Sequence, residues 1–259
     1  MSAPPAPVAP PGGPGPAGPP PAPVDNQKLR VRRDRVLTPL RIGRHHAPDG
    51  ALDRLQLAGT FGLRLGRDSD GLPVAITLFH PDPWSVALVG GTWAAKLIAF
   101  RALRFGARVL VRAGSPAGWS ELGQVATGRT DRVVVLAPGT PVGVTASADT
   151  PVLLLWDSDT PPVVGEPAAW QTRLTLMRRL TPDRVAAVSR ADMVLMQRLT
   201  PSETSAVVPA LRLAPGPAQQ LSMLGNDMLA VLSRENARYV WVDGNDPVER
   251  ERVGQPGRY

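Results

Sequence analysis

The clearest hydrophobic pattern in the chain lies between residues 85 and 112. Residues 85–89 and 108–112 are short runs rich in Val, Leu and Ala, which are typical of strands buried on both faces of a sheet. Between them stand the pair Gly90–Gly91 and an amphipathic segment that predicts a helix from Thr92 to Phe105, ended by Gly106. This order of strand, glycine turn, helix and strand predicts the opening unit of a parallel α/β sheet.

The rest of the chain contains apolar runs that predict further strands. Residues 61–66 and 74–79 predict an antiparallel hairpin whose turn is Asp68–Gly71. A proline directly after a capping residue predicts helix starts at Ser115 and Thr200. Further strands are expected over residues 132–136, 151–156, 171–176, 193–198, 227–232 and 237–242. Further helices are expected over 200–208 and 217–224, and a short helix or a turn over 187–192. The pattern therefore predicts an α/β fold with a mixed, mostly parallel sheet and helices on both faces, preceded by the antiparallel hairpin.

Composition divides the 259-residue chain into four parts. Residues 1–24 are almost entirely Pro, Ala and Gly, have too few side chains to form a core, and are expected to be a disordered arm. Residues 25–50 are expected to be a basic linker, residues 51–246 a single α/β domain, and residues 247–259 a polar, flexible tail. The absence of cysteine excludes disulfides and thiolate metal sites and fits a cytoplasmic protein. The sequence offers neither an apolar run of about 18–20 residues to cross a bilayer nor the start of a secretory signal peptide.

The net charge of +7 is concentrated in one segment. Residues 28–46 hold seven basic residues and one acid, Asp34, so that 7 − 1 = +6 of the charge lies there. Arginine binds phosphate and carboxylate groups bidentately, so this segment is a candidate contact for an acidic membrane surface or an acidic protein. No aromatic residue separates the arginines, which argues against nucleic acid as a partner. The candidate contact residues are Arg30, Arg32, Arg33, Arg35, Arg41 and Arg44.

The glycine turn stands where a nucleotide-binding protein holds phosphate, but it departs from the phosphate-loop pattern G-x-x-x-x-G-K-[ST]. Gly90 and Lys96 have the required spacing, whereas Ala95 replaces the second glycine and Leu97 replaces the hydroxyl that would hold magnesium. Asp157 ends an apolar strand, as the magnesium-holding aspartate of such proteins does, but no glutamate follows it to activate water. Two interpretations stay open. The turn keeps only the fold, or a remnant site formed by Gly90, Gly91, Lys96 and Asp157 binds nucleotide without efficient hydrolysis.

Other residues that suggest chemistry are better explained by structure. Asp68 and Asp70 lack the later ligands of a calcium loop and fit a hairpin turn. Asp157 and Asp159 match the D-x-D metal motif of sugar-nucleotide transferases, although the same residues fit a turn after a strand. The chain has no Gly-x-Ser-x-Gly elbow, and His80 is expected to be structural. The sequence therefore predicts no catalytic residue, no metal site and no cofactor, and hence a protein that is not an enzyme.

Several short motifs resemble the C-terminal part of EccE, a component of actinobacterial type VII (ESX) secretion machines. They are Gly62-Leu-Arg-Leu-Gly-Arg, Gly71-Leu-Pro-Val, the stretch from Val86 to Leu97, and Gly106-Ala-Arg-Val-Leu-Val, and the resemblance covers roughly residues 55–160. It implies a structural subunit without enzymatic activity that binds EccB-, EccC- and EccD-like proteins at the cytoplasmic face of the membrane. Members of that family usually begin with transmembrane helices, whereas this chain has the proline arm and the basic linker in their place. Peripheral attachment to the membrane is therefore expected.

A second resemblance gives the alternative. The segment from Leu221 to Val242 is similar to the end of FtsK/EccC-type ATPase domains, where Asp-Met-Leu leads into a final hairpin. Together with the altered phosphate loop, it implies a degenerate ATPase-like module that binds nucleotide without efficient hydrolysis.

Overall fold

The computed structural model describes residues 62–114, 116, 118–137, 140–157, 167–233, 236–244 and 246–258. They belong to the second of two compact units, Leu55–Tyr259. The expected arm 1–24 and the basic linker 25–50, with all six candidate arginines, lie outside the described residues. Both therefore stay predictions.

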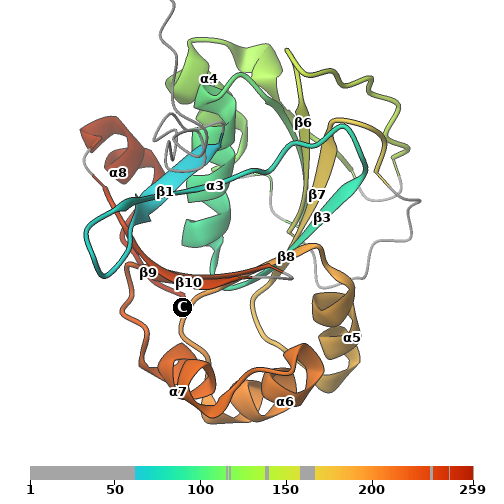
Figure 1. Ribbon diagram of the computed structural model, residues 1–259. Coiled ribbons are helices and arrows are strands. Elements are labelled where there is room, and N and C mark those ends of the chain that lie inside the picture. The colour runs from blue at the N-terminus through green and yellow to red at the C-terminus, as the bar shows by residue number, and fades with distance from the viewer. Residues whose placement is uncertain are drawn as a thin grey trace, which may run out of the picture. The chain divides into compact units, whose positions relative to one another are not determined.

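The described strands form one mixed sheet (Figure 1). In chain order they are β1 (Leu63–Arg67), β2 (Pro73–Ile76), β3 (Trp84–Val89), β4 (Arg108–Ala113), β5 (Val133–Val135), β6 (Val152–Asp157), β7 (Gln171–Met177), β8 (Met193–Met196), β9 (Met228–Ser233) and β10 (Ala237–Val242). Their order across the sheet is β2-β1-β10-β9-β8-β3-β7-β6-β4-β5. Neighbours from β8 to β5 are parallel, and neighbours from β8 to β2 are antiparallel. The predicted mixed, mostly parallel sheet is confirmed, and the β1–β2 hairpin forms one of its edges because β1 pairs with β10.

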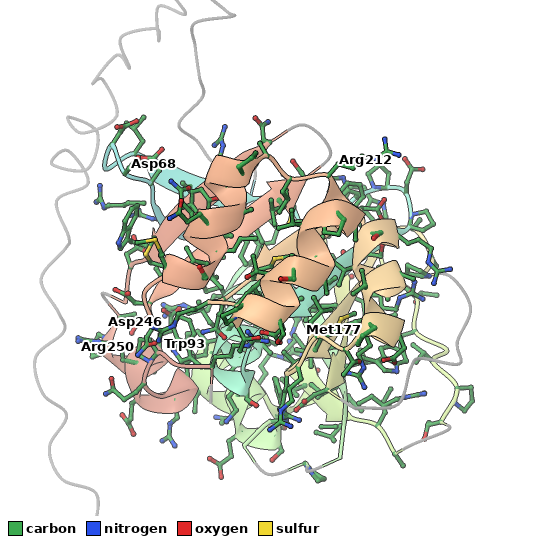
Figure 2. All side chains as sticks on the ribbon, turned by 90° about the horizontal axis from the view of Figure 1, so that it is seen from below. Asp68, Trp93, Met177, Arg212, Asp246 and Arg250 are labelled. Carbon is green, nitrogen blue, oxygen red and sulfur yellow. The ribbon has the colours of Figure 1, made fainter. Side chains whose placement is uncertain are left out.

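Helices cover both faces of the sheet, as predicted. One face carries α3 (Thr92–Arg104), α4 (Ser120–Thr127) and α8 (Pro247–Val253), and a short 3-10 helix, η1 (Thr130–Arg132), precedes β5. The other face carries α5 (Pro182–Arg190), α6 (Pro201–Leu211) and α7 (Pro215–Met223), which lie in front of the sheet in Figure 2. Leu88 of β3 packs into the core under α3, and the next residue, Val89, packs into the core under α5–α7. This alternation explains why the apolar run of β3 is unbroken, since both faces of the strand are buried.

The predicted strand–turn–helix–strand unit forms as β3, Gly90–Gly91, α3 and β4. Gly106 follows the helix with φ +103°, and its N–H donates to the carbonyl of Leu103, which reverses the chain toward β4. β3 and β4 are not neighbours in the sheet, because β7 and β6 lie between them. The chain therefore returns later to fill the gap that the first unit leaves.

The turn of the predicted hairpin is also confirmed. The Oδ1 atom of Asp68 accepts hydrogen bonds from the backbone N–H groups of Asp70 and Leu72, at 3.0 and 2.9 Å. Gly71 has φ +75°, a conformation that favours glycine. Asp68 thus holds its own turn together.

Two helices begin elsewhere than predicted. α4 begins at Ser120 because Gly118, with φ +81°, cannot be part of a right-handed helix. Ser115, the predicted start, lies outside the described residues. α5 begins at Pro182 and not near residue 187. Thr181 and Pro182 form the same capping residue–proline pair that marks Thr200–Pro201, so the sequence did contain this signal.

Helix α8 replaces the first part of the flexible tail that was expected from residue 247. The Oδ1 atom of Asp246 accepts hydrogen bonds from the N–H groups of Val248 and Glu249, at 2.9 and 3.4 Å, and Pro247 occupies the first helical position. Val253 and Glu249 are buried. Burial of these two side chains, added to the cap, outweighs the polar character from which a frayed end was inferred.

Candidate functional site

The Gly90–Gly91 turn lies at the carboxyl end of the parallel strands, the edge at which open α/β sheets bind ligands. The turn joins β3 to α3, and β6, two strands away, ends at the same edge with Asp157. The structure therefore brings Gly90, Gly91 and Asp157 to the carboxyl ends of the parallel strands, on one side of the sheet. Whether they form a phosphate site depends on which backbone and side-chain groups are available there.

The backbone N–H groups of the turn are already used. Gly90 donates to the carbonyl of Met177, at 3.0 Å, and Gly91 donates to Oε1 of Gln197, at 2.7 Å. Gln197 follows β8 directly and its side chain is buried. A phosphate loop works by offering such N–H groups to the ligand. In this conformation the two glycines have no N–H group to offer.

Lys96 is part of α3 and not of the turn. Only Gly90 and Gly91 connect β3 to the helix, so Lys96 is the fifth residue of α3. Its Nζ atom lies beside Gly118, where an added Cβ would be 2.8 Å away. The spacing between Gly90 and Lys96 thus matches a phosphate loop in sequence, but the intervening residues are helical and do not form a loop.

Asp157 faces a basic side chain. Its buried carboxylate lies 2.7 Å, through Oδ1, from Nη2 of Arg178, the residue after β7. The same Nη2 atom donates to Oγ1 of Thr92, the first residue of α3, at 3.1 Å. A guanidinium therefore connects Asp157 to the start of α3. The guanidinium of Arg178 thus lies where a magnesium-holding aspartate would need its metal ion.

The last described residues of the chain cover the turn. Residues 254–258, which we call the C-terminal strap, follow α8 and return to this edge of the sheet. The carbonyl of Gly257 accepts a hydrogen bond from Nε2 of Gln197, at 3.2 Å. A Cβ added to Gly91 would lie 2.5 Å from the carbonyl oxygen of Arg258. Gln197 therefore holds the glycine turn through one end of its amide and the strap through the other.

The side chain of Arg258 is held by four acceptor contacts. Its Nη1 and Nη2 atoms contact Oε2 and Oε1 of Glu203 at 2.7 and 2.5 Å, and they donate to the carbonyls of Arg198 and Arg178 at 2.6 and 3.1 Å. Both side chains are buried, with 5% of Arg258 and 7% of Glu203 exposed. Glu203 lies in the first turn of α6 and caps it in a capping box with Thr200. One carboxylate thus both starts a helix and binds the strap.

The pKa of Glu203 reflects both roles. Burial acts to raise the pKa of this carboxyl. The hydrogen bonds from Arg258 and from the N–H groups of Leu180 and Thr200 act in the opposite direction and prevail, so the pKa lies below its ordinary value. Glu203 is therefore held as a carboxylate.

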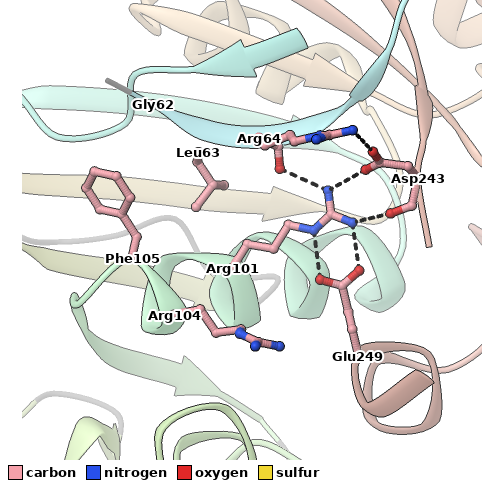
Figure 3. Close-up of a pocket in the computed structure, with 8 residues that line it drawn as sticks. All are labelled: Gly62, Leu63, Arg64, Arg101, Arg104, Phe105, Asp243 and Glu249. Atoms are coloured by element: carbon pink, nitrogen blue, oxygen red, sulfur yellow. Dashed lines mark hydrogen bonds and ion pairs between the residues drawn. The ribbon is translucent and has the colours of Figure 1, made fainter. Parts of the chain in front are cut away.

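A second cluster of charged residues surrounds a shallow pocket of about 330 Å³ near α8 (Figure 3). The guanidinium of Arg101, on α3, contacts both carboxylate oxygens of Glu249 at 2.8 and 2.6 Å. It also donates to the backbone carbonyls of Leu65 and Asp243, at 2.6 and 2.7 Å. Arg101 thereby ties α8 to β1 and to the end of β10. The guanidinium nitrogens of Arg101 are thus all bound to protein acceptors. This arrangement favours a structural role for the pocket over a catalytic one.

The residues that close the glycine turn were not identified from the sequence. Gln197, Arg178 and Arg258 carry no motif, and Glu203 lies in the first turn after the predicted helix start at Thr200, a position that gives no sign of its contact with Arg258. Asp159, the second aspartate of the D-x-D motif, lies outside the described residues. Among the residues with described positions, no helix has both the length and the apolar character needed to span a membrane.

No protein-family model matches this chain, and no curated protein matches it. Among solved structures, it is similar to VirB4 of Thermoanaerobacter pseudethanolicus, with 9% identity, 73% of this chain and 98% of that chain covered, and a TM-score of 0.49. It is also similar to the genome packaging NTPase B204 from Sulfolobus turreted icosahedral virus 2 in complex with AMP, with 12% identity, 64% and 98% covered, and a TM-score of 0.42. A third similar structure is Thermomonospora curvata EccC (ATPases 2 and 3) in complex with a signal sequence peptide, with 11% identity, 75% and 43% covered, and a TM-score of 0.41. Likenesses this distant transfer no residue role, ligand or partner to this chain.

Proposed function

We propose that this chain is a non-enzymatic structural subunit that binds other proteins of a type VII secretion apparatus. The proposed absence of enzymatic activity is supported by the contacts that close the glycine turn. The N–H groups of Gly90 and Gly91 both donate to protein acceptors, and the carbonyl of Arg258 stands over Gly91. A turn in this state offers neither of its two glycine N–H groups to a triphosphate.

The secretion apparatus is proposed from the sequence motifs over residues 55–160 that resemble EccE. On this proposal the partners are EccB-, EccC- and EccD-like subunits, bound at the cytoplasmic face of the membrane. The basic linker 25–50 is proposed to assist peripheral attachment by contacting anionic lipid.

An exposed aromatic side chain offers a contact for such partners. Trp241 of β10 is 41% exposed and stands opposite Met228 of β9 in the sheet register. Aromatic residues and methionine are enriched in protein interfaces. We therefore propose that the exposed surface around Trp241, on the β9–β10 pair of strands, takes part in assembly.

Co-purification tests this proposal. Wild-type protein from a native membrane fraction is expected to bring down the EccC- or EccD-like subunit, and Trp241→Ser is expected to reduce the recovery. Val134→Ser is the matched control, because Val134 is 45% exposed on β5, the edge strand far from β10. Recovery of the wild-type protein without any such subunit would contradict the proposal.

The second candidate function is a nucleotide-binding module without efficient hydrolysis. It is favoured by the position of Gly90, Gly91 and Asp157 at one edge of the sheet. Calorimetry with Mg-ATP separates the two functions. The structural subunit predicts no heat of binding, whereas binding that Lys96→Ala abolishes would favour the module.

A further inference from the structure

The pocket that holds Arg258 has the chemistry of an arginine-recognition site. Among the described residues, the carboxylate of Glu203 and the carbonyls of Arg178 and Arg198 accept hydrogen bonds from the guanidinium. The carboxylate engages both terminal nitrogens of the fork, and each carbonyl takes one further N–H. Acceptors that engage both terminal nitrogens fit guanidinium better than ammonium, because Lys has a single point charge and no fork.

The pocket is also preformed on rigid elements. Glu203 is fixed by the backbone N–H groups of Leu180 and Thr200, at 2.9 Å each, independently of Arg258. Arg178 follows β7 directly and Arg198 is the second residue after β8, so the sheet positions both carbonyls. The acceptors would therefore stay in place if the strap left.

The strap itself is held by polar contacts at one end. Within residues 254–258 the packing contacts are those of Gly257 and Arg258, while Gly254, Gln255 and Pro256 are exposed. The preceding residue, Val253, is buried and anchors α8. Gly254 has φ +90°, so a glycine stands at the junction between the anchored helix and the strap. The contacts that hold α8, made by Val253 and by the N–H group of Gly254, are therefore separate from those that hold Arg258.

We propose that this pocket is a docking site for an extended, arginine-bearing segment of a partner protein, and that the C-terminal strap occupies it in cis until the partner displaces it. Release of the strap also uncovers Gly91 and frees Nε2 of Gln197, so partner binding would reshape the end of the β3–α3 unit. Because the strap is tethered at Val253, its effective concentration is high, and the partner segment must compete with it. This inference goes beyond the proposed function and does not rest on it, since peptide binding can be measured whatever apparatus the chain joins.

The test uses a labelled peptide with the sequence of residues 254–258, Gly-Gln-Pro-Gly-Arg, and the full-length chain. Arg258→Ala empties the pocket, so fluorescence anisotropy is expected to show the peptide binding to this variant at least about tenfold more tightly than to the wild-type chain. The same peptide with lysine in place of arginine is the matched control and is expected to lose about tenfold in affinity.

Equal binding to both proteins, or binding to neither, would overturn the proposal. If Arg258→Ala does not fold, Arg258→Lys replaces it, because lysine keeps the charge and loses the fork. A second measurement needs no variant. Excess peptide added to the wild-type chain is expected to increase the solvent accessibility of residues 254–258 in hydrogen exchange, and no change at saturating peptide would count against displacement.

Discussion

The guanidinium of Arg258 lies against the carboxylate of Glu203, with Nη2 2.5 Å from Oε1 and Nη1 2.7 Å from Oε2. The two residues are 55 positions apart and join the C-terminal strap to the first turn of α6. This pair decides what the glycine turn can do, because it places the backbone of Arg258 over Gly91.

Loss of this pair is expected to lower stability. Removing one member of a buried ion pair costs about 3–5 kcal/mol when the other is left uncompensated. Glu203 keeps two backbone N–H donors, so Arg258→Ala is expected to cost less, about 2 kcal/mol, in the free energy of unfolding. Urea denaturation measures this change in the free energy of unfolding. A change below about 0.5 kcal/mol, the size of an ordinary surface substitution, would mean that the ion pair adds nothing to stability.

The same pair predicts an acid-sensitive contribution to stability. The pKa of Glu203 is lowered in the folded protein, so its contribution is fully present above the ordinary glutamate pKa of about 4.3 and is lost as the pH falls through the lowered folded value. The difference in melting temperature between wild type and Glu203→Gln should therefore shrink below about pH 4. If the melting temperatures of wild type and Glu203→Gln differ by the same amount down to pH 3, ionisation of Glu203 does not contribute to stability.

Gly91→Ala should disturb the strap. The new methyl group would meet the backbone of Arg258, and overpacking of this kind costs about 1–3 kcal/mol. Gly91 is also the residue that caps α3, where alanine is unfavourable in its own right. Repeating the substitution in the Arg258→Ala background separates the two effects, because the strap is no longer held by Glu203 there and its backbone can move away from residue 91, so that only the helix-cap part should persist. Gly114→Ala, which meets no atom within 4 Å, is the control.

Arg101 is expected to be essential for docking of α8. Arg101→Lys loses the paired contacts to Glu249 as well as carbonyl contacts to β1 and the end of β10, and should cost about 3 kcal/mol. Hydrogen exchange in residues 247–253 should accelerate. Arg104, like Arg101, lies on α3, but its side chain is exposed. Arg104→Ala removes a surface ion pair with Asp246 and should cost no more than about 1 kcal/mol in the free energy of unfolding. Equal effects of the two substitutions would contradict this assignment.

The elements that the sequence predicted well are those with strong local patterns. β3, α3 and β4 form as expected because the apolar runs, the glycine pair and Gly106 all agree on the same local structure. α6 begins at its capping box for the same reason. α8 was missed although Asp246 and Pro247 form a good helix start, because the polar composition after them was given more weight.

The candidate site was predicted only in part. The sequence indicated Gly90, Lys96 and Asp157 from their spacing and strand positions. It did not indicate that Lys96 lies inside α3, because the pattern of a phosphate loop does not fix where the helix begins. Nor did it indicate that Arg178 pairs with Asp157, since β6 and β7 become neighbours only in the folded sheet.

The sequence by itself determined the order of the strands, most of the helices between them and the departures from a phosphate loop, since these depend on residues close together in the chain. Only the tertiary structure decided that Gln197, Glu203 and Arg258 close the glycine turn and that Arg101 finds Glu249, 148 positions away. A polar side chain can pair with any suitable partner, and its choice is made by the topology that brings distant segments into hydrogen-bonding distance.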